Sequence, residues 1–424
     1  MKRRLFILFP VLAVVVMTVA FGGGTARAST ITVSAPCNNI TEDGGTPLSS
    51  TDESSCLTIW LATLGLETNT SATPIVWDLE GQSYEVDKGI TVAGAQYFTI
   101  QNGSFYNAEN PDTVAYGGTP TIDLAGAKTY SKNPINGTND TLQNLTIEGT
   151  YPGGGLRASM ENAAGILTEG VQNVTISNDN ISYSWGDALH LAPYLVPPVE
   201  GAQSLTTGIV NLVTINHTGR CGIAPIGVDA LNIENTSMSG TGYCAIDMEV
   251  DSGNTPVKAV TLTNVTTDSF IELDGVAGPI VINGWTETAN EDPDLLDESD
   301  RNNKNTVPDL TVENSAVHCG ETSGPYPCWD IHGTPEGAVI NNSVTLMADN
   351  AYQNNTPLWS VGADSPTLFN DDCVSTNLGT YKAGDGGSGA VTVSAGPDFT
   401  CPTLPPPAPG DPAITTGPFP QPRN

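Results

Sequence analysis

Three short segments between residues 186 and 249 hold most of the side chains that can do chemistry. They read GDALHLAP, GRCGIAPIG and GYCAIDMEV, with apolar residues at alternate positions. Such alternation is typical of strands, whose successive side chains point to opposite faces. Aligning the apolar positions brings His190 and Asp247 into one outward-pointing column, which continues as Glu272 in DSFIELDGV and as Asp330 in CWDIHG. Histidine and carboxyl groups are the usual general acids and bases.

Asp247 and Glu249 are the predicted catalytic pair. They lie two positions apart on one strand, so they face the same way, with about 6.5–7 Å between their Cα atoms. That spacing suits an inverting glycosidase, in which one carboxyl protonates the leaving oxygen while the other activates water. Glu272 is expected about 4.8 Å from Asp247 on the next strand. Its charge should raise the pKa of one carboxyl and keep an acid protonated near neutral pH.

The other members of the predicted site come from neighbouring segments. Arg220 and His190 are predicted to position the sugar, and a lyase or an epimerase would use one of them as its base. Further substrate contacts are predicted for Asp187, Glu272, Trp185 and Tyr243. The aromatic side chains predicted to be exposed for stacking on sugars are Trp185, Tyr194, Tyr243 and Trp329. The competing interpretation is an ordinary acidic surface, on which Arg220 only pairs with Asp247 and Glu249.

A short strand motif of the type apolar–Thr–apolar recurs along the chain and organises these segments. Its copies lie at residues 98–100, 145–147, 174–176, 213–215, 231–233, 260–262, 280–282, 310–312 and 339–340. Steps of roughly 20–40 residues fit one turn of a β-solenoid with loops of variable length. Stacked turns of such a solenoid place distant segments side by side.

Asparagine follows the motif by two residues in six copies: Asn102, Asn178, Asn235, Asn264, Asn314 and Asn342. In stacked turns these amides are expected to hydrogen-bond one another at a bend with left-handed backbone. On this feature, residues 75–350 resemble the right-handed parallel β-helix proteins of the pectate-lyase-like superfamily. The resemblance implies an all-β fold, a right-handed parallel β-helix. The helical pattern at 55–66 (CLTIWLATLGL after Ser55) is expected to cap its N-terminal end.

The run GD-x-x-H-L, GR-x-GI, AID-x-E also resembles a pattern of secreted bacterial β-helix proteins that are associated with polysaccharides. The motifs of polygalacturonase-like relatives are incomplete, because the chain has Asn178-Asp179-Asn180 and Gly186-Asp187 but no Asp-Asp pair, Gly-His-Gly or Arg-x-Lys. Calcium-dependent pectate lyases need an arginine or lysine as base, and in this chain only Arg220 could serve. We therefore expect a polysaccharide or glycan partner and a hydrolase or lyase. The alternative is a non-catalytic adhesion or glycan-binding solenoid.

The termini and the charge bear on location and partners. A basic start, an apolar run at residues 5–21 and Ala26-Arg27-Ala28 predict a secretory signal over residues 1–28, with an uncleaved anchor as the alternative. We expect a secreted, monomeric protein without membrane contact after cleavage. The formal net charge of −32 argues against nucleic acid and anionic membranes as partners. It also disfavours polyanionic glycans unless calcium bridges them.

Eight cysteines in an exported chain predict disulfides. Pairing between sequence neighbours is the simplest connectivity: Cys37–Cys56, Cys221–Cys244, Cys319–Cys328 and Cys373–Cys401. The second pair is the best supported, because the alignment stacks it about 4.8 Å apart on adjacent turns, close to the usual Cα separation.

The chain is thus divided into a cap at 29–73, a β-helix at 74–350, a C-terminal cap segment at 351–401 and a Pro-rich disordered tail at 402–424. No cofactor is expected. An acidic loop at 291–305 offers possible calcium ligands in Asp292, Asp294, Asp297 and Asp300, but its spacing is not that of an EF-hand.

Overall fold

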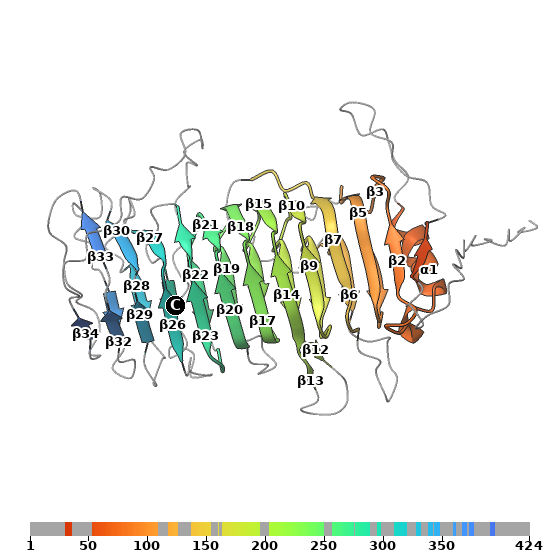
Figure 1. The fold of residues 1–424 in the computed structure, drawn as a ribbon. Coiled ribbons are helices and arrows are strands. Elements are labelled where there is room, and N and C mark those ends of the chain that lie inside the picture. Colours follow the sequence, from red (N-terminus) through yellow and green to blue (C-terminus); the bar gives the residue numbers. More distant parts are fainter. Residues whose placement is uncertain are drawn as a thin grey trace, which may run out of the picture.

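The protein folds into a right-handed parallel β-helix, as predicted from the sequence. The computed structural model describes residues 30–35, 53–108, 118–125, 137–153, 160, 163–195, 203–249, 257–274, 276–288, 295–297, 309–319, 328–331, 338–341, 343–347, 359–361, 367–370, 373–376 and 391–394. Figure 1 shows the strands stacked side by side along one axis, with helix α1 at the N-terminal end.

The larger sheet of the described residues contains two rows of strands that meet at a bend. Its members are β1 (Ile31–Val33), β2 (Ile75–Asp78), β3 (Ser83–Glu85), β5 (Phe98–Tyr106), β7 (Thr141–Glu148), β9 (Val174–Ser177), β10 (Asn180–Ser182), β14 (Thr206–Asn211), β15 (Thr214–Thr218), β17 (Val228–Glu234), β18 (Ser237–Thr241), β20 (Lys258–Thr263), β21 (Thr266–Thr267), β23 (Ile280–Asn283), β24 (Thr286–Glu287), β26 (Leu310–Glu313), β27 (Ala316–Cys319), β29 (Ala338–Asn341), β30 (Val344–Met347), β32 (Thr367–Asn370), β33 (Cys373–Thr376) and β34 (Val391–Ser394). Strands β5 and β7 run through the bend and belong to both rows.

A second parallel sheet closes the coil. It consists of β4 (Ile90–Ala93), β6 (Ile122–Ala125), β8 (Ile166–Glu169), β11 (Leu189–Ala192), β16 (Ile223–Pro225), β19 (Ile246–Glu249), β22 (Ile271–Asp274), β25 (Leu295–Asp297), β28 (Trp329–Ile331) and β31 (Trp359–Val361). Strands β12 (Tyr194–Leu195) and β13 (Gln203–Ser204) form a separate antiparallel pair. Parallel pairing continues past residue 350 as far as β34.

Two of the nine motif copies lie in a different row from the others. Residues 145–147 and 213–215 follow the bend and pair with β10, whereas the equivalents of Ile176 in the first row are Leu142 and Val210. Both rows alternate apolar and polar residues, so the motif alone does not distinguish them. The predicted alignment was wrong for these two copies.

The predicted asparagine ladder is present at the bend. Asn144 donates to Asn102 (3.0 Å), and Asn178 donates to Asn144 (2.6 Å). Asn264 donates to Asn235 (3.2 Å). The left-handed backbone expected at these positions is also observed, with φ between 49° and 62° at Asn102, Asn144, Asn178, Asn235 and Asn264. Asn342 lies outside the described residues.

The ladder is interrupted where other residues occupy the bend. Leu212 stands there with φ 57° and an exposed side chain, and Asn235 donates instead to the preceding Asn211 (2.9 Å). Gly284 makes the second interruption, with φ 76°. Asn314 (φ 51°) then donates to Asn283, one residue before the bend. The amide contacts therefore continue, but from a shifted position.

The core and its N-terminal cap follow from the apolar pattern. Helix α1 (Ser54–Thr63) buries Leu57, Trp60 and Leu61, and the Trp60 ring lies edge-on to Trp77 of the first coil at 5.0 Å. The helix ends earlier than predicted because Gly65 adopts φ 64°, which ends a helix and leads here into a 3-10 turn, Leu66–Thr68. No helix of the described residues is long and apolar enough to cross a membrane.

The Cys221–Cys244 disulfide joins adjacent coils as predicted, with 4.8 Å between the Cα atoms. Cys56 and Cys328 are also disulfide-bonded. Cys37 and Cys401 lie outside the described residues, as do the side chains of Cys319 and Cys373, so the other three pairings stay predictions. The predicted signal, the Pro-rich tail and most of the acidic loop likewise lie outside.

Candidate functional site

The second sheet brings the predicted column together in the expected register. Leu189 pairs with Ile223, and Ile223 pairs with Ile246, so His190 and Asp247 lie on the same face two coils apart. Asp247 pairs with Glu272, which is followed by Leu296 and then by Asp330. The column is therefore confirmed, with apolar residues at Ala224 and Leu296 among its polar members.

Arg220 lies at the centre of a group that we call the Arg220 cluster: Asp187, His190, Arg220, Asp247, Glu249 and Glu272. Arg220 comes from the turn before β16, and its guanidinium contacts Asp187 Oδ2 at 3.2 Å and Asp247 Oδ2 at 2.9 Å. Glu249 Oε2 lies 3.5 Å from the same guanidinium. One cation therefore contacts three carboxyl groups, which come from the turns on either side of its own.

Asp187 ties the cluster to the backbone. Its Oδ1 accepts a hydrogen bond from the backbone N–H of Cys221 at 2.9 Å, and its Oδ2 lies 2.9 Å from Nδ1 of His190. The disulfide holds Cys221 beside Cys244, three residues before Asp247. The side chains that bind Arg220 and His190 are thus fixed by a covalent link between coils.

Asp247 is 1% exposed although it lies on the outward face. Arg220, His190 and Asp187 are buried as well. These four residues are therefore buried although the column points outward from the sheet. The Asp247 Oδ1 atom has no hydrogen-bond partner in the structure.

The electrostatics of Asp247 favour its protonated form. Burial raises its pKa well above the usual range, and the charges of Glu272 and Glu249 raise it further, while Arg220 opposes the change. The cluster has four carboxyl groups against one guanidinium and one imidazole, so its charges do not cancel. Burial and the neighbouring carboxyl groups thus make Asp247 a weaker acid than an exposed aspartate.

The two predicted catalytic carboxyl groups share a contact with Arg220. Asp247 Oδ2 and Glu249 Oε2 both contact Nη2 of Arg220, at 2.9 and 3.5 Å, so these two oxygens lie within 6.4 Å of one another. Inverting glycosidases separate their carboxyl groups by about 6.5–9.5 Å to admit water. In this structure Nη2 of Arg220 bridges the two carboxyl groups.

Sequence reasoning missed two acidic groups on the same face. Asp123 of β6 lies two coils before His190 in the column, and burial together with Glu169 raises its pKa to about 7. Burial also raises the pKa of Glu169 in β8, and His190 opposes that change. The register of β6 and β8 with β11 was the available signal, but the repeat motif had not been traced there.

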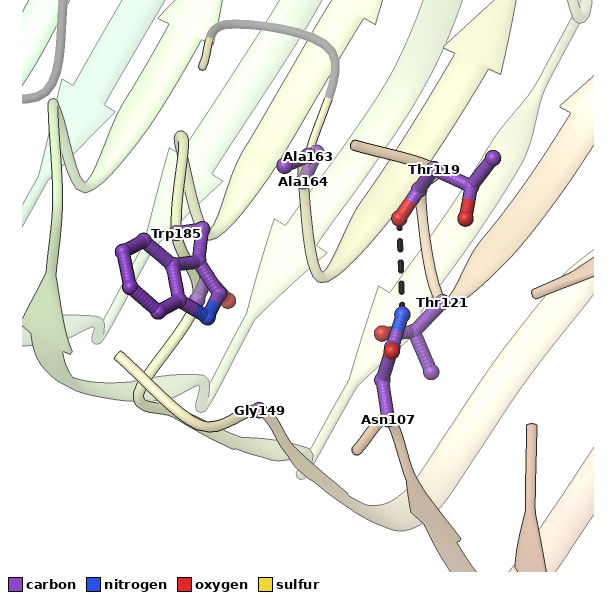
Figure 2. A pocket seen from close by; sticks show the side chains of 8 residues that line it. Asn107, Thr119, Thr121, Gly149, Ala163, Ala164 and Trp185 are labelled. Atoms are coloured by element: carbon purple, nitrogen blue, oxygen red, sulfur yellow. Dashed lines mark hydrogen bonds between the residues drawn. The ribbon is translucent and has the colours of Figure 1, made fainter. Parts of the chain in front are cut away.

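Trp185 and Trp329 are not exposed. Trp185 packs edge-on to Tyr151 at 5.7 Å and donates its Nε1–H to Thr150 at 2.9 Å. In Figure 2 it lines a small hollow with Asn107, Thr119, Thr121, Gly149, Ala163, Ala164 and Ser184. Trp329 is a core residue. The prediction of exposure was wrong for both, because each indole packs against another aromatic ring and donates its N–H to a threonine hydroxyl.

Tyr243 lies at the edge of the cluster. It is half-buried, contacts Phe270 edge-on at 5.2 Å and packs against the disulfide. The side chain of Tyr194 lies outside the described residues. Among the described residues, Cys221, Cys244 and Asp247 lie close enough to hold a metal ion, but both sulfurs are in the disulfide. They are therefore not available as ligands.

Comparisons with known proteins place the chain by its fold. No family model and no curated protein matches it. It is similar to the solved Agl-KA catalytic domain (TM-score 0.55, 11% identity, covering 89% of this chain and 70% of that one). It is also similar to endo-xylogalacturonan hydrolase from Aspergillus tubingensis (TM-score 0.47, 15% identity, covering 83% of this chain and 98% of that one). A third similar structure is the surface protein and adhesin PfbA of Streptococcus pneumoniae (TM-score 0.36, 12% identity, covering 83% of this chain and 98% of that one). At these identities the likeness shows the β-helix fold alone.

Proposed function

We propose that the protein is an exported carbohydrate-active enzyme that hydrolyses a neutral polysaccharide at the Arg220 cluster. The supporting observation is the pairing of unlike carboxyl groups on one strand. Asp247 is buried, has a raised pKa and carries an oxygen without a partner. Glu249 is 33% exposed at its side chain and pairs with Arg220. Environments that push two carboxyl pKa values apart are typical of acid and base assignments.

In this mechanism Asp247 gives its proton to the leaving glycosidic oxygen, and Glu249 accepts a proton from the attacking water. Arg220 contacts both groups, and its positive charge favours the ionised form of a neighbouring carboxyl. Because Arg220 must shift for Asp247 to contact a sugar, substrate hydroxyl groups are expected to replace part of its contacts. Activity should fall as the pH rises through the raised pKa of Asp247, since the acid then loses its proton.

A neutral substrate follows from the charges of the site. Arg220 already binds three carboxylates, so its charge is not free for a uronate. Asp123 and Glu169 add further acidic groups along the same face. A polyanionic chain would meet a face on which carboxyl groups outnumber cations, so a neutral chain is favoured.

The test replaces Asp247 and Glu249 by their amides. We expect Asp247→Asn and Glu249→Gln each to lower turnover on neutral polysaccharides by about 10²-fold or more, measured as reducing ends released, with binding kept. Glu234→Gln is the matched control, because this carboxyl lies in β17 of the other sheet. Turnover retained in both amide variants would sink the proposal. Binding without any turnover by the intact protein would indicate a glycan-binding solenoid.

A second candidate is a polysaccharide lyase, which the Asp187–His190 contact favours. A carboxylate 2.9 Å from Nδ1 orients an imidazole as a base. A lyase makes an unsaturated product that absorbs in the ultraviolet, whereas a hydrolase does not. Loss of such a product in His190→Gln, with Asp247→Asn active, would favour the lyase.

A further inference from the structure

Tyr183 and His217 form an exposed pair of stacked rings. Their centroids lie 5.1 Å apart and their planes differ by 12°. Tyr183 is 39% exposed, and among the described residues it is the aromatic member of the exposed large hydrophobic side chains. His217 is exposed as well. Among the described residues, the other tyrosine and tryptophan rings named above are buried or half-buried.

Both rings are held on unfavourable backbone. Tyr183 has φ 57° and His217 has φ 54°, in the left-handed region that disfavours bulky residues. The next coil has Gly240 at the same position, with φ 66°, which is the residue that such a turn prefers. Leu212 and Tyr97 share this backbone conformation, so what distinguishes Tyr183 and His217 is that their rings stack and are exposed.

Glycines flank the ring pair on the two neighbouring coils. Glu148 pairs with Ser182, so Gly149 occupies the position next to Tyr183 and adds no side chain above it. On the other side, a Cβ at Gly240 would lie 3.0 Å from Cδ2 of His217, so the glycine lets the imidazole lie close to its coil. The result is a platform of two stacked rings, flanked by glycines and 39% exposed at Tyr183.

The platform lies close to the Arg220 cluster. Tyr183 precedes Asp187 by four residues, and His217 precedes Arg220 by three, so each of the two turns supplies both a ring and a cluster residue. Four residues of extended chain span at most about 14 Å. The platform and the cluster therefore lie within the span of a few sugar units.

We propose that the Tyr183–His217 platform is a sugar-binding subsite that stacks on the ring of a neutral pyranose. The proposal rests on the proposed function, because it extends the same glycan from the Arg220 cluster. Flat aromatic rings take up the apolar C–H face of a sugar whose hydroxyl groups are equatorial, as in glucose and xylose units. A nucleic acid would also stack on such rings, but the acidic chain repels it.

The test separates a ligand role from a structural one with Tyr183→Asn. Asparagine accepts left-handed backbone, so we expect an unchanged or higher melting temperature. Affinity for mixed-linkage β-glucan or arabinoxylan should fall about 3- to 10-fold, measured by titration in the Asp247→Asn background. Tyr183→Phe should keep the affinity. Tyr97→Asn is the control, because Tyr97 also has positive φ (51°) but lies at another turn.

Each outcome decides the proposal. Unchanged affinity of Tyr183→Asn, or an equal loss in Tyr97→Asn, would overturn the subsite. A lower melting temperature with unchanged affinity would show that the stack is structural. If the glycan binds through Tyr183 without ever being cleaved, the subsite stands and the hydrolase proposal fails. If cleavage depends on Asp247 while Tyr183→Asn binds normally, the hydrolase proposal stands and the subsite fails.

Discussion

The asparagine ladder and the Arg220 cluster both stack polar side chains along the axis of the coil. Only the ladder supplies both the donors and the acceptors of its own hydrogen bonds. In the ladder, Asn144 donates to Asn102 and accepts from Asn178, so one residue type supplies both halves of each contact. In the Arg220 cluster carboxyl groups outnumber cations, and the Oδ1 atom of Asp247 has no partner. An amide repeat can be extended indefinitely, whereas stacked carboxylates cannot.

This difference separates a structural device from a candidate site. A carboxylate has acceptors and no donor, so stacking it raises a pKa or requires a cation. The cluster shows both responses, in the raised pKa of Asp247 and in the three contacts of Arg220. Polar repeats that balance their donors and acceptors stabilise the coil, and repeats that do not balance retain reactivity.

Removing the cation should have the largest effect. Arg220→Met leaves buried carboxylates without their partner, and we expect the free energy of unfolding to fall by about 3–5 kcal/mol. Urea denaturation at pH 7 measures it. Asn178→Ala in the ladder is the comparison, with an expected loss of about 1 kcal/mol. Similar losses of unfolding free energy in the two variants would contradict the distinction between the ladder and the Arg220 cluster.

Asp179, which follows Asn178 of the ladder, allows the comparison to be tested within the ladder itself. Its Oδ1 accepts from the backbone N–H of Leu145 at 2.7 Å, its Oδ2 has no partner, and burial raises its pKa to about 7. The folded state therefore binds the proton more tightly than the unfolded state. Stability from this proton is complete below about pH 4 and is lost as the pH rises through 7.

Asp179→Asn keeps the Oδ1 acceptor and removes the charge. We expect stabilisation by up to ~4 kcal/mol at pH 8 and little change at pH 4, measured by urea denaturation at both values. Activity should be unaffected, in contrast to Asp247→Asn. A stability gain that does not depend on pH would contradict the assigned pKa.

The disulfide should rank third. Cys221 and Cys244 are 23 residues apart, and replacing both by alanine is expected to cost about 3 kcal/mol through the freed unfolded chain. Turnover should also fall, because the backbone N–H of Cys221 holds Asp187. Thermal unfolding and the polysaccharide assay measure the two effects. Unchanged turnover would show that backbone hydrogen bonds alone position Asp187.

The smallest effect is expected where the ladder is interrupted. Leu212 is 54% exposed with φ 57°, so Leu212→Asn removes no core contact and offers an amide to its neighbours. We expect a gain of about 1 kcal/mol, against no gain for Leu212→Ala. Chemical denaturation of both variants measures it. Equal stability of the two would mean that the shifted contact from Asn211 already replaces the missing amide.

The amino-acid sequence was enough to predict the coil, the register of Leu189 with Ile223 and Ile246, the Cys221–Cys244 bond and most ladder positions. These features depend on a short pattern repeated in each coil, and stacking turns that pattern into neighbouring contacts. Where two rows shared the same pattern, at residues 145–147 and 213–215, sequence reasoning chose the wrong row. Asn144 was missed for that reason, although it follows Leu142 by the same two positions.

Tertiary structure decided what the repeat does not encode. Arg220 and Tyr183 come from turns, whose side-chain directions do not follow the alternation of a strand, so the burial of Asp247 and the exposure of Tyr183 appear only in three dimensions. The raised pKa of Asp123 likewise depends on Glu169 of another coil. Alternation specifies which face a strand residue takes, whereas burial and charge depend on every neighbour that the folded coil brings near.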